Sequence, residues 1–178
     1  KIHNISLNDT EILQEYNLRK DEFDYSVHSP NTNTTPTYWS VSSVWAGDGF
    51  GGAGHLSPWL NSDLGWAAGA NNTSQWIALN YDEPTSIKGI VMQPRAASFG
   101  QYVTKADIQT SLTGSAPWTT VMSNATINSS ITEDNRVLFP NPVFAKAVRL
   151  VPLTWNNHIT IRMGLLLKPI VYTTDRSE

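Results

Sequence analysis

Apolar and polar residues alternate in short runs from residue 38 onward, which is the spacing of β-strands rather than of helices. The runs are rich in Val, Ile, Thr and aromatic residues, recur roughly every 10 to 15 residues, and are separated by clusters of Gly, Pro, Asn and Ser. They cover residues 39–44, 75–79, 86–93, 105–111, 118–123, 136–143, 147–153 and 158–167. This pattern predicts an all-β domain of the sandwich or jelly-roll kind.

The N-terminal part of the chain has a different character. Apolar side chains fall at helical spacing over residues 9–24, and residues 29–36 are a Ser-, Pro-, Asn- and Thr-rich stretch without apolar periodicity. We therefore expect an N-terminal extension or linker over residues 1–37, one domain over residues 38–170, and a C-terminal tail over residues 171–178.

Composition excludes several classes of protein. Among 178 residues only 15% are charged, the net charge is −3, and no run of Lys or Arg is present, so we expect no nucleic-acid partner. The chain has no cysteine, which excludes disulfides, thiol catalysis and thiolate metal sites. No apolar stretch approaches the roughly 18 residues that a transmembrane helix needs.

Motifs typical of enzymes are absent or lack their structural context. Residues 47–52 match the G-x-G-x-x-G pattern, but Gly54-His-Leu-Ser-Pro58 follows where a helix should begin, so the segment is interpreted as a flexible loop. The four histidines lack metal-site spacing, and no G-x-S-x-G motif occurs. A pair of glycosidase carboxylates stays open at this stage, because their separation is a tertiary property. We predict that the protein is not an enzyme.

Two loops carry side chains that are unusual for connecting segments. The first spans residues 45–60 and combines glycines with aromatic residues and a histidine, and the second spans residues 94–101. Arginine offers a planar set of donors to hydroxyls or anions, and an aromatic face packs on a sugar ring or inserts among lipid headgroups. The candidate ligand-binding residues are Trp45, Asp48, Phe50, His55, Asn61, Asp63, Arg95 and Phe99.

Four segments together resemble the discoidin family, which includes the C domains of coagulation factors V and VIII, slime-mould discoidins and family 32 carbohydrate-binding modules. The most specific is Pro152-Leu-Thr-Trp-Asn-Asn-His-Ile-Thr-Ile-Arg162, which resembles the strand that closes the family's domain. The others are residues 66–79, Gln93-Pro-Arg95 and Tyr102-Val-Thr-Lys105. The resemblance covers about residues 38–169.

The resemblance implies an eight-stranded jelly-roll β-sandwich of the galactose-binding-like type, with ligand-binding loops called spikes at one end. It maps the loops at 45–60 and 95–101 onto two of the spikes. It gives mainly structural roles to a further set of residues: Trp66, Trp76, Trp155 and Arg162.

The chain departs from the family at two places. Animal members join the ends of the domain with a cysteine pair, and both cysteines are missing here. Many bacterial members hold a structural calcium with a C-terminal Glu, whereas Gly164 and Leu165 stand at that place, and Asn61-Ser-Asp63 is only a loose substitute for the calcium loop. No cofactor is indicated, and a structural calcium stays open.

Three hypotheses of function follow, all using the same loops. The first is a non-catalytic, extracellular carbohydrate-binding adhesion module that recognises cell-surface glycans, in which Arg95 and His55 bind hydroxyls, Asn61 or Asp63 assists, and an aromatic residue stacks on the ring. The second is binding to anionic phospholipid, as the factor V/VIII resemblance implies, which the scarcity of basic residues in the loops disfavours. The third is recognition of a protein receptor.

Seven N-x-S/T sequons are compatible with an extracellular location. They lie at Asn4, Asn8, Asn33, Asn71, Asn72, Asn124 and Asn128.

Overall fold

The computed structural model describes residues 25–30, 38–49, 54–95, 100–127 and 134–168. In these ranges the chain forms nine β-strands and one short 3₁₀ turn, η2 (Trp45–Gly47). The strands are β1 (Ser26–His28), β2 (Trp39–Val41), β3 (Leu56–Ser57), β4 (Gly65–Ala67), β5 (Ile77–Gln93), β6 (Tyr102–Ser111), β7 (Thr119–Thr126), β8 (Asn135–Asn156) and β9 (Thr160–Leu167). No helix in these ranges is long and apolar enough to cross a membrane.

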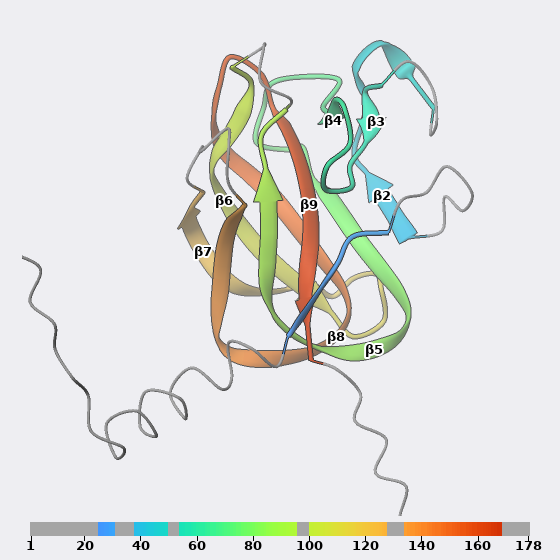
Figure 1. Cartoon of the computed structure of the whole chain (residues 1–178), viewed down its shortest axis with the longest axis vertical. Helices are drawn as coiled ribbons and strands as arrows, with labels where there is room; N and C mark the ends of the chain where they lie inside the picture. The colour runs from blue at the N-terminus through green and yellow to red at the C-terminus, as the bar shows by residue number, and fades with distance from the viewer. Residues whose placement is uncertain (1–24, 31–37, 50–53, 96–99, 128–133, 169–178) are drawn as a thin grey trace, which may run out of the picture.

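All pairings between the strands are antiparallel, and the strands form one continuous hydrogen-bonded sheet. Its order is β3-β4-β9-β5-β8-β6-β7, with β1 added to β9 and β2 added to β5. Figure 1 shows that the sheet folds over on itself. The result is the jelly-roll β-sandwich that the sequence predicted.

The fold-over is produced by two long strands. The first part of β5 pairs with β2 and with residues 147–150 of β8, whereas its second part pairs with β9 and with residues 135–145 of β8. The register of the β5–β8 pair shifts between Asn80 and Thr85. Pro84 lies within this shift, where a residue without an N–H donor does not interrupt the hydrogen-bonded ladder.

The core lies between the layers and is made of large apolar side chains that are fully buried. Trp66, Ile77, Leu79, Ile90 and Leu150 each have no exposed surface, which is typical of a sandwich interior filled from alternate positions of each strand. The burial of Trp66 agrees with the structural role that the family resemblance implied.

Several predicted boundaries differ from the observed ones. The predicted run 75–79 begins two residues before the single strand β5, which also contains the run 86–93, and the runs 136–143 and 147–153 are both within β8. Periodicity divided them because register shifts interrupt the alternation there. The predicted loop at 45–60 contains η2 and β3, and β1 lies within the predicted extension 1–37. The predicted helix at 9–24 lies outside the described residues.

The segment after β1 is fastened to the sandwich by one hydroxyl. Ser29 Oγ donates to the carbonyl of Met163 at 2.8 Å and accepts from the backbone N–H of Leu60, also at 2.8 Å. Gly164 permits this approach, because a Cβ at that position would lie 2.9 Å from the Ser29 side chain and 2.9 Å from that of Leu60. The segment after β1, the end of the loop at 45–60 and β9 are therefore held together at one point.

Candidate functional site

A cleft opens at the end of the sandwich where β5 and β8 end and where β6 and β9 begin. These strand ends lie at the top of Figure 1. Its volume is about 290 Å³. Its lining residues come from segments far apart in the sequence, and they are Trp45, His55, Ala67, Arg95, Gln101 and His158. Trp45 and His55 of the loop at 45–60, which we call the first spike, supply one wall. Arg95 and Gln101, at the two ends of the β5–β6 connection, supply the second, and His158, between β8 and β9, supplies the third.

The wall from the first spike contains a histidine paired with an aspartate. The Nδ1 atom of His55 lies 2.6 Å from Oδ2 of Asp48, and the two side chains are 22% and 21% exposed. Gly54 allows the chain to bring His55 to this place, because its φ is +111° and a Cβ there would lie 2.0 Å from a methyl carbon of Leu64. Backbone geometry therefore fixes the position of the pair.

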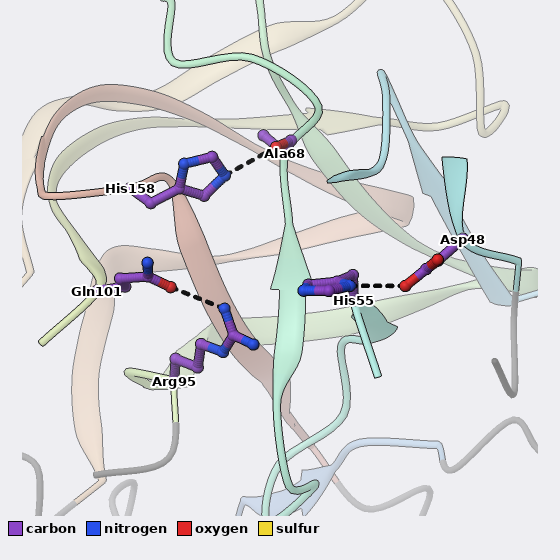
Figure 2. Close-up of polar contacts among 6 residues, drawn as sticks. All are labelled: Asp48, His55, Ala68, Arg95, Gln101 and His158. Carbon is purple, nitrogen blue, oxygen red and sulfur yellow. Dashed lines mark hydrogen bonds and ion pairs between the residues drawn. The ribbon is translucent and has the colours of Figure 1, made fainter. Parts of the chain in front are cut away.

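The wall after β5 contains a guanidinium group held by an amide. Nη1 of Arg95 donates to Oε1 of Gln101 at 2.8 Å, and the Arg95 N–H donates to the Gln101 carbonyl at 3.3 Å. Burial lowers the pKa of Arg95, but an arginine starts so high that the group stays cationic at neutral pH. The hydrogen bonds with Gln101 thus hold the cationic guanidinium of Arg95 at the cleft in a defined orientation (Figure 2).

The third wall is formed by His158, whose ring contacts Trp45 of the first spike. Nε2 of His158 lies 2.8 Å from the carbonyl oxygen of Ala68, and because a carbonyl only accepts, this nitrogen carries the hydrogen. The His158 ring meets Trp45 edge to face, with ring centroids 5.1 Å apart and an interplanar angle of 86°. Trp45 remains 47% exposed, so it presents an aromatic surface beside the polar groups.

A second polar cluster, which we call the Arg162 network, consists of Asn61, Ser62, Gln93, Asp134 and Arg162. The amide of Gln93 accepts from the Asn61 N–H at 2.8 Å and donates to Oδ1 of Asn61 at 2.9 Å and to Asp134 at 2.7 Å. Arg162 donates from Nη1 to the Ser62 carbonyl at 2.6 Å and from Nε to the Pro94 carbonyl at 2.8 Å. Most of these polar groups are therefore satisfied within the chain.

Arg162 is the positively charged group of this network, and it interacts with the negative charges of Asp134 and Asp63. Burial lowers the pKa of Arg162, and the carboxylates of Asp134 and Asp63 oppose that shift. This arrangement agrees with the structural role that the family resemblance gave to Arg162.

The residues near Asp63 do not fit a calcium ion. Calcium requires six to eight oxygen ligands, but the Ser62 carbonyl is hydrogen-bonded to a guanidinium and Oδ1 of Asn61 to an amide. A Glu could not replace Gly164 without displacing Ser29 or Leu60. Within the described ranges, no group of three or more His, Asp or Glu side chains is placed to hold a metal ion.

The structure thus divides the eight candidate residues into three groups. Trp45, His55 and Arg95 line the cleft, and Asp48 lies behind His55. Asn61 belongs to the Arg162 network and Asp63 lies close to it, on the evidence of its charge interaction with Arg162.

The two remaining candidates, Phe50 and Phe99, lie outside the described residues. Sequence reasoning missed His158 and Gln101, which both line the cleft. His158 lies within the motif Pro152–Arg162, which was assigned to the fold, and Gln101 is the last residue of the second loop. Their place at the ends of predicted strands was the signal that could have found them.

A β-sandwich with a polar cleft and an exposed tryptophan among the loops at one end has the architecture of a binding module. The chain belongs to the F5/8 type C domain family, whose members include the discoidins, and the family match covers residues 27–165.

Two curated relatives are each 30% identical to this chain over the aligned residues. A discoidin-1 chain from Dictyostelium discoideum is 30% identical over 114 residues, which are 62% of this chain and 44% of that protein. Lactadherin from Rattus norvegicus is 30% identical over 147 residues, which are 75% of this chain and 34% of that protein. The chain therefore spans less than half the length of these two relatives.

Solved structures agree with the fold. The crystal structure of an F5/8 type C domain from Bacteroides fragilis has a TM-score of 0.62 and 19% identity, covering 83% of this chain and 99% of that one. Another is chitosan-binding module 2 from a Paenibacillus sp. chitosanase/glucanase, which was solved in complex with chitotriose. It has a TM-score of 0.50 and 26% identity, and the match covers 72% of this chain and 89% of that one.

Proposed function

We propose that this protein is a non-catalytic carbohydrate-binding module that recognises glycans outside the cell and serves in adhesion. The observation that carries the proposal is the cleft, which brings Trp45, His55, Arg95, Gln101 and His158 around one hollow of about 290 Å³. Concave sites that combine an aromatic surface with a few fixed polar groups are typical of small-ligand binding.

The chemistry of the cleft matches that of a sugar ring. The exposed face of Trp45 suits the apolar C–H surface of the ring, and the Arg95 guanidinium donates hydrogen bonds to hydroxyl oxygens. Phe50 and Phe99, from the same loops, remain proposed stacking residues. Asn61 and Asp63 remain proposed assisting residues, although their observed contacts favour a structural part.

The same observations weigh against an anionic phospholipid surface as the ligand. Attraction to such a surface is worth about 1 kcal/mol for each Lys or Arg nearby, which requires several exposed cations around the inserted aromatic residue. At the cleft, Arg95 is half-buried and bound to Gln101, and Asp48 adds a negative charge. A carbohydrate is therefore the better match to the cleft.

The comparison with the Paenibacillus module also supports a saccharide ligand, since that module was solved with chitotriose bound. An extracellular location is supported by the sequons. The three sequon asparagines within the described ranges, Asn71, Asn72 and Asn124, are all exposed.

The test is a glycan array probed with the wild-type protein and with Arg95→Ala. We expect the variant to lose at least tenfold in binding, because a hydrogen bond from a charged donor contributes about 1.5–3 kcal/mol. Arg136→Ala is the matched control, since Arg136 is an exposed arginine on β8 that does not line the cleft. Its binding should equal that of the wild type.

Two results would contradict the proposal. One is undiminished glycan binding by a correctly folded Arg95→Ala variant. The other is a protein that binds no glycan but sediments with phosphatidylserine vesicles, which would favour the phospholipid function.

A further inference from the structure

An arginine outside both the cleft and the Arg162 network packs against two tryptophan rings. Arg149 is on β8, and its central carbon Cζ lies over the Trp118 ring at 4.3 Å from the centroid and over the Trp76 ring at 5.7 Å. None of the three residues lines the cleft. Arg149 is about 20 Å along an extended strand from Asn156, where β8 ends. The cluster is therefore separate from the cleft.

The cluster lies on the outer face of the sheet, away from the core. Ala78 pairs with Arg149 and Ala147 precedes it by two residues, so both methyl groups share its side of the sheet. Both alanines have no exposed surface, yet neither belongs to the core cluster. Small side chains at these two positions leave room next to the sheet for the arginine and the indoles. Trp76 and Trp118 are half-buried, so part of each ring contacts solvent.

A glutamine fixes the guanidinium and leaves one of its edges available. Nε and Nη2 of Arg149 both donate to Oε1 of Gln109, at 2.9 Å and 2.5 Å. Among the described residues Nη1 has no acceptor, and it is not one of the buried atoms without a partner, so it is accessible to solvent. The edge formed by Nη1 and the second N–H of Nη2 can therefore hold a carboxylate through two parallel hydrogen bonds.

The positive charge of Arg149 has no counter-charge in the described part of the chain. No ion pair of Arg149 is found there. Burial alone lowers its pKa, whereas the carboxylates of Asp134 and Asp63 oppose the same effect at Arg162. An arginine nevertheless stays cationic at neutral pH. The cluster thus presents an oriented cation that lacks an anionic partner.

The groups in line with Arg149 are neutral. The strand pairings place one residue from each of five strands in a row across the sheet: Ser40, Ala78, Arg149, Gln109 and Thr120. Neighbouring strands are about 4.8 Å apart, so the row is about 19 Å long. One cation among neutral groups does not match a nucleic acid or an anionic membrane, which need many. It matches a chain in which a carboxylate stands among hydroxyl groups.

We propose that Arg149, Trp76 and Trp118 form a second ligand site, on the face of the sheet, that binds a carboxylated saccharide chain. The free guanidinium edge holds the carboxylate of a uronic acid unit, and the indoles pack against the apolar C–H surface of the adjoining sugar rings. Trp76, to which the family resemblance gave a structural role, also belongs to this site. The site is independent of the cleft and goes beyond the function proposed for it.

Binding is tested by NMR titration of the whole chain with two acidic probes, a hyaluronan hexasaccharide and a hexamer of mannuronic acid. Each is compared with its methyl ester, which keeps the sugar chain but removes the charge. We expect an acidic probe to shift the indole N–H signals of Trp76 and Trp118 and the Nε–H signal of Arg149. The ester should bind about tenfold more weakly or worse, because a neutral group forms a weaker bond with the guanidinium.

Two variants separate a ligand site from a structural stack. Arg149→Lys keeps the charge but loses the two-donor edge, so it should bind the acidic probe about tenfold more weakly. Gln109→Glu places a carboxylate on the guanidinium inside the protein, so it should keep the fold and also weaken binding of the probe. Urea unfolding checks the stability of both. Arg136→Lys, an exposed arginine on the same strand, is the control and should bind as the wild type does.

Arg95→Ala tests whether the acidic probe binds in the cleft instead. We expect this variant to keep its affinity for the probe. Loss of binding in Arg95→Ala with full binding in Arg149→Lys would assign the probe to the cleft and overturn the inference.

Three further results would overturn it: neither acidic probe binds, the ester binds as tightly as the acid, or hexaglutamate binds as tightly as the saccharides, which would indicate an acidic peptide ligand. None of these results affects the function proposed for the cleft, because that proposal is tested on the glycan array through Arg95→Ala alone.

Discussion

The cleft and the Arg162 network contain the same kinds of side chain but use them differently. Each has an arginine, a glutamine and an aspartate brought together by loops and strand ends. In the Arg162 network these groups bind one another and backbone carbonyls, so the cluster fastens the chain at Ser62 and Pro94 to β9. In the cleft they surround a hollow, with a tryptophan 47% exposed beside them.

The difference shows that residue type alone does not distinguish a binding site from a cluster that stabilises the fold. Arg95 and Arg162 lie near each other in the fold. Arg162 is on β9 and pairs with Gln93, the last residue of the neighbouring strand β5, and Arg95 follows two residues later. Arg162 donates to two backbone carbonyls, whereas Arg95 donates to a glutamine side chain that itself lines the cleft.

Removing the arginine of the network should damage the fold and spare binding. Arg162→Ala loses two hydrogen bonds from a charged donor to carbonyls, so we expect the free energy of unfolding to fall by about 2–3 kcal/mol. Urea unfolding followed by tryptophan fluorescence measures this loss. Glycan binding per folded molecule should stay within about twofold of the wild type, and a selective loss of binding would erase the distinction between the two regions.

A change at Asn61 should give a smaller effect of the same kind. Asn61 has a φ of +60° and accepts a hydrogen bond from Gln93, so Asn61→Ala should lower the free energy of unfolding by about 1–2 kcal/mol. Asn61→Gly keeps the backbone conformation accessible and should recover part of that loss. If instead Asn61→Ala abolishes glycan binding in a stable protein, Asn61 belongs to the ligand site after all.

The smallest expected effect concerns the stability of the fold in acid. Burial lowers the pKa of His28, so the unfolded chain takes up a proton more readily than the folded protein does. Stability should therefore fall as the pH drops from 7 to 5. Urea unfolding at several pH values should show a shallower slope for His28→Gln; an identical slope would exclude His28 as the cause.

Much of the fold could be predicted because it depends on local pattern. Alternating runs identified the all-β class, and the segment from Pro152 to Arg162 led to the family. The buried Trp66 and the network-bound Arg162 agree with the roles that the resemblance implied. Periodicity failed at the bends of β5 and β8, because a register shift changes which face a residue occupies without changing its hydrophobicity.

The sequence by itself determined the class of fold, the family and three of the residues that line the cleft, Trp45, His55 and Arg95, because these depend on residue type and on short-range spacing. Only the tertiary structure added His158 and Gln101, placed Asp48 on His55, and assigned Asn61 to the Arg162 network. These contacts join residues that are far apart in the sequence, such as Trp45 and His158. Such contacts are created when the strands pair and bring their ends together, so no local pattern in the chain encodes them.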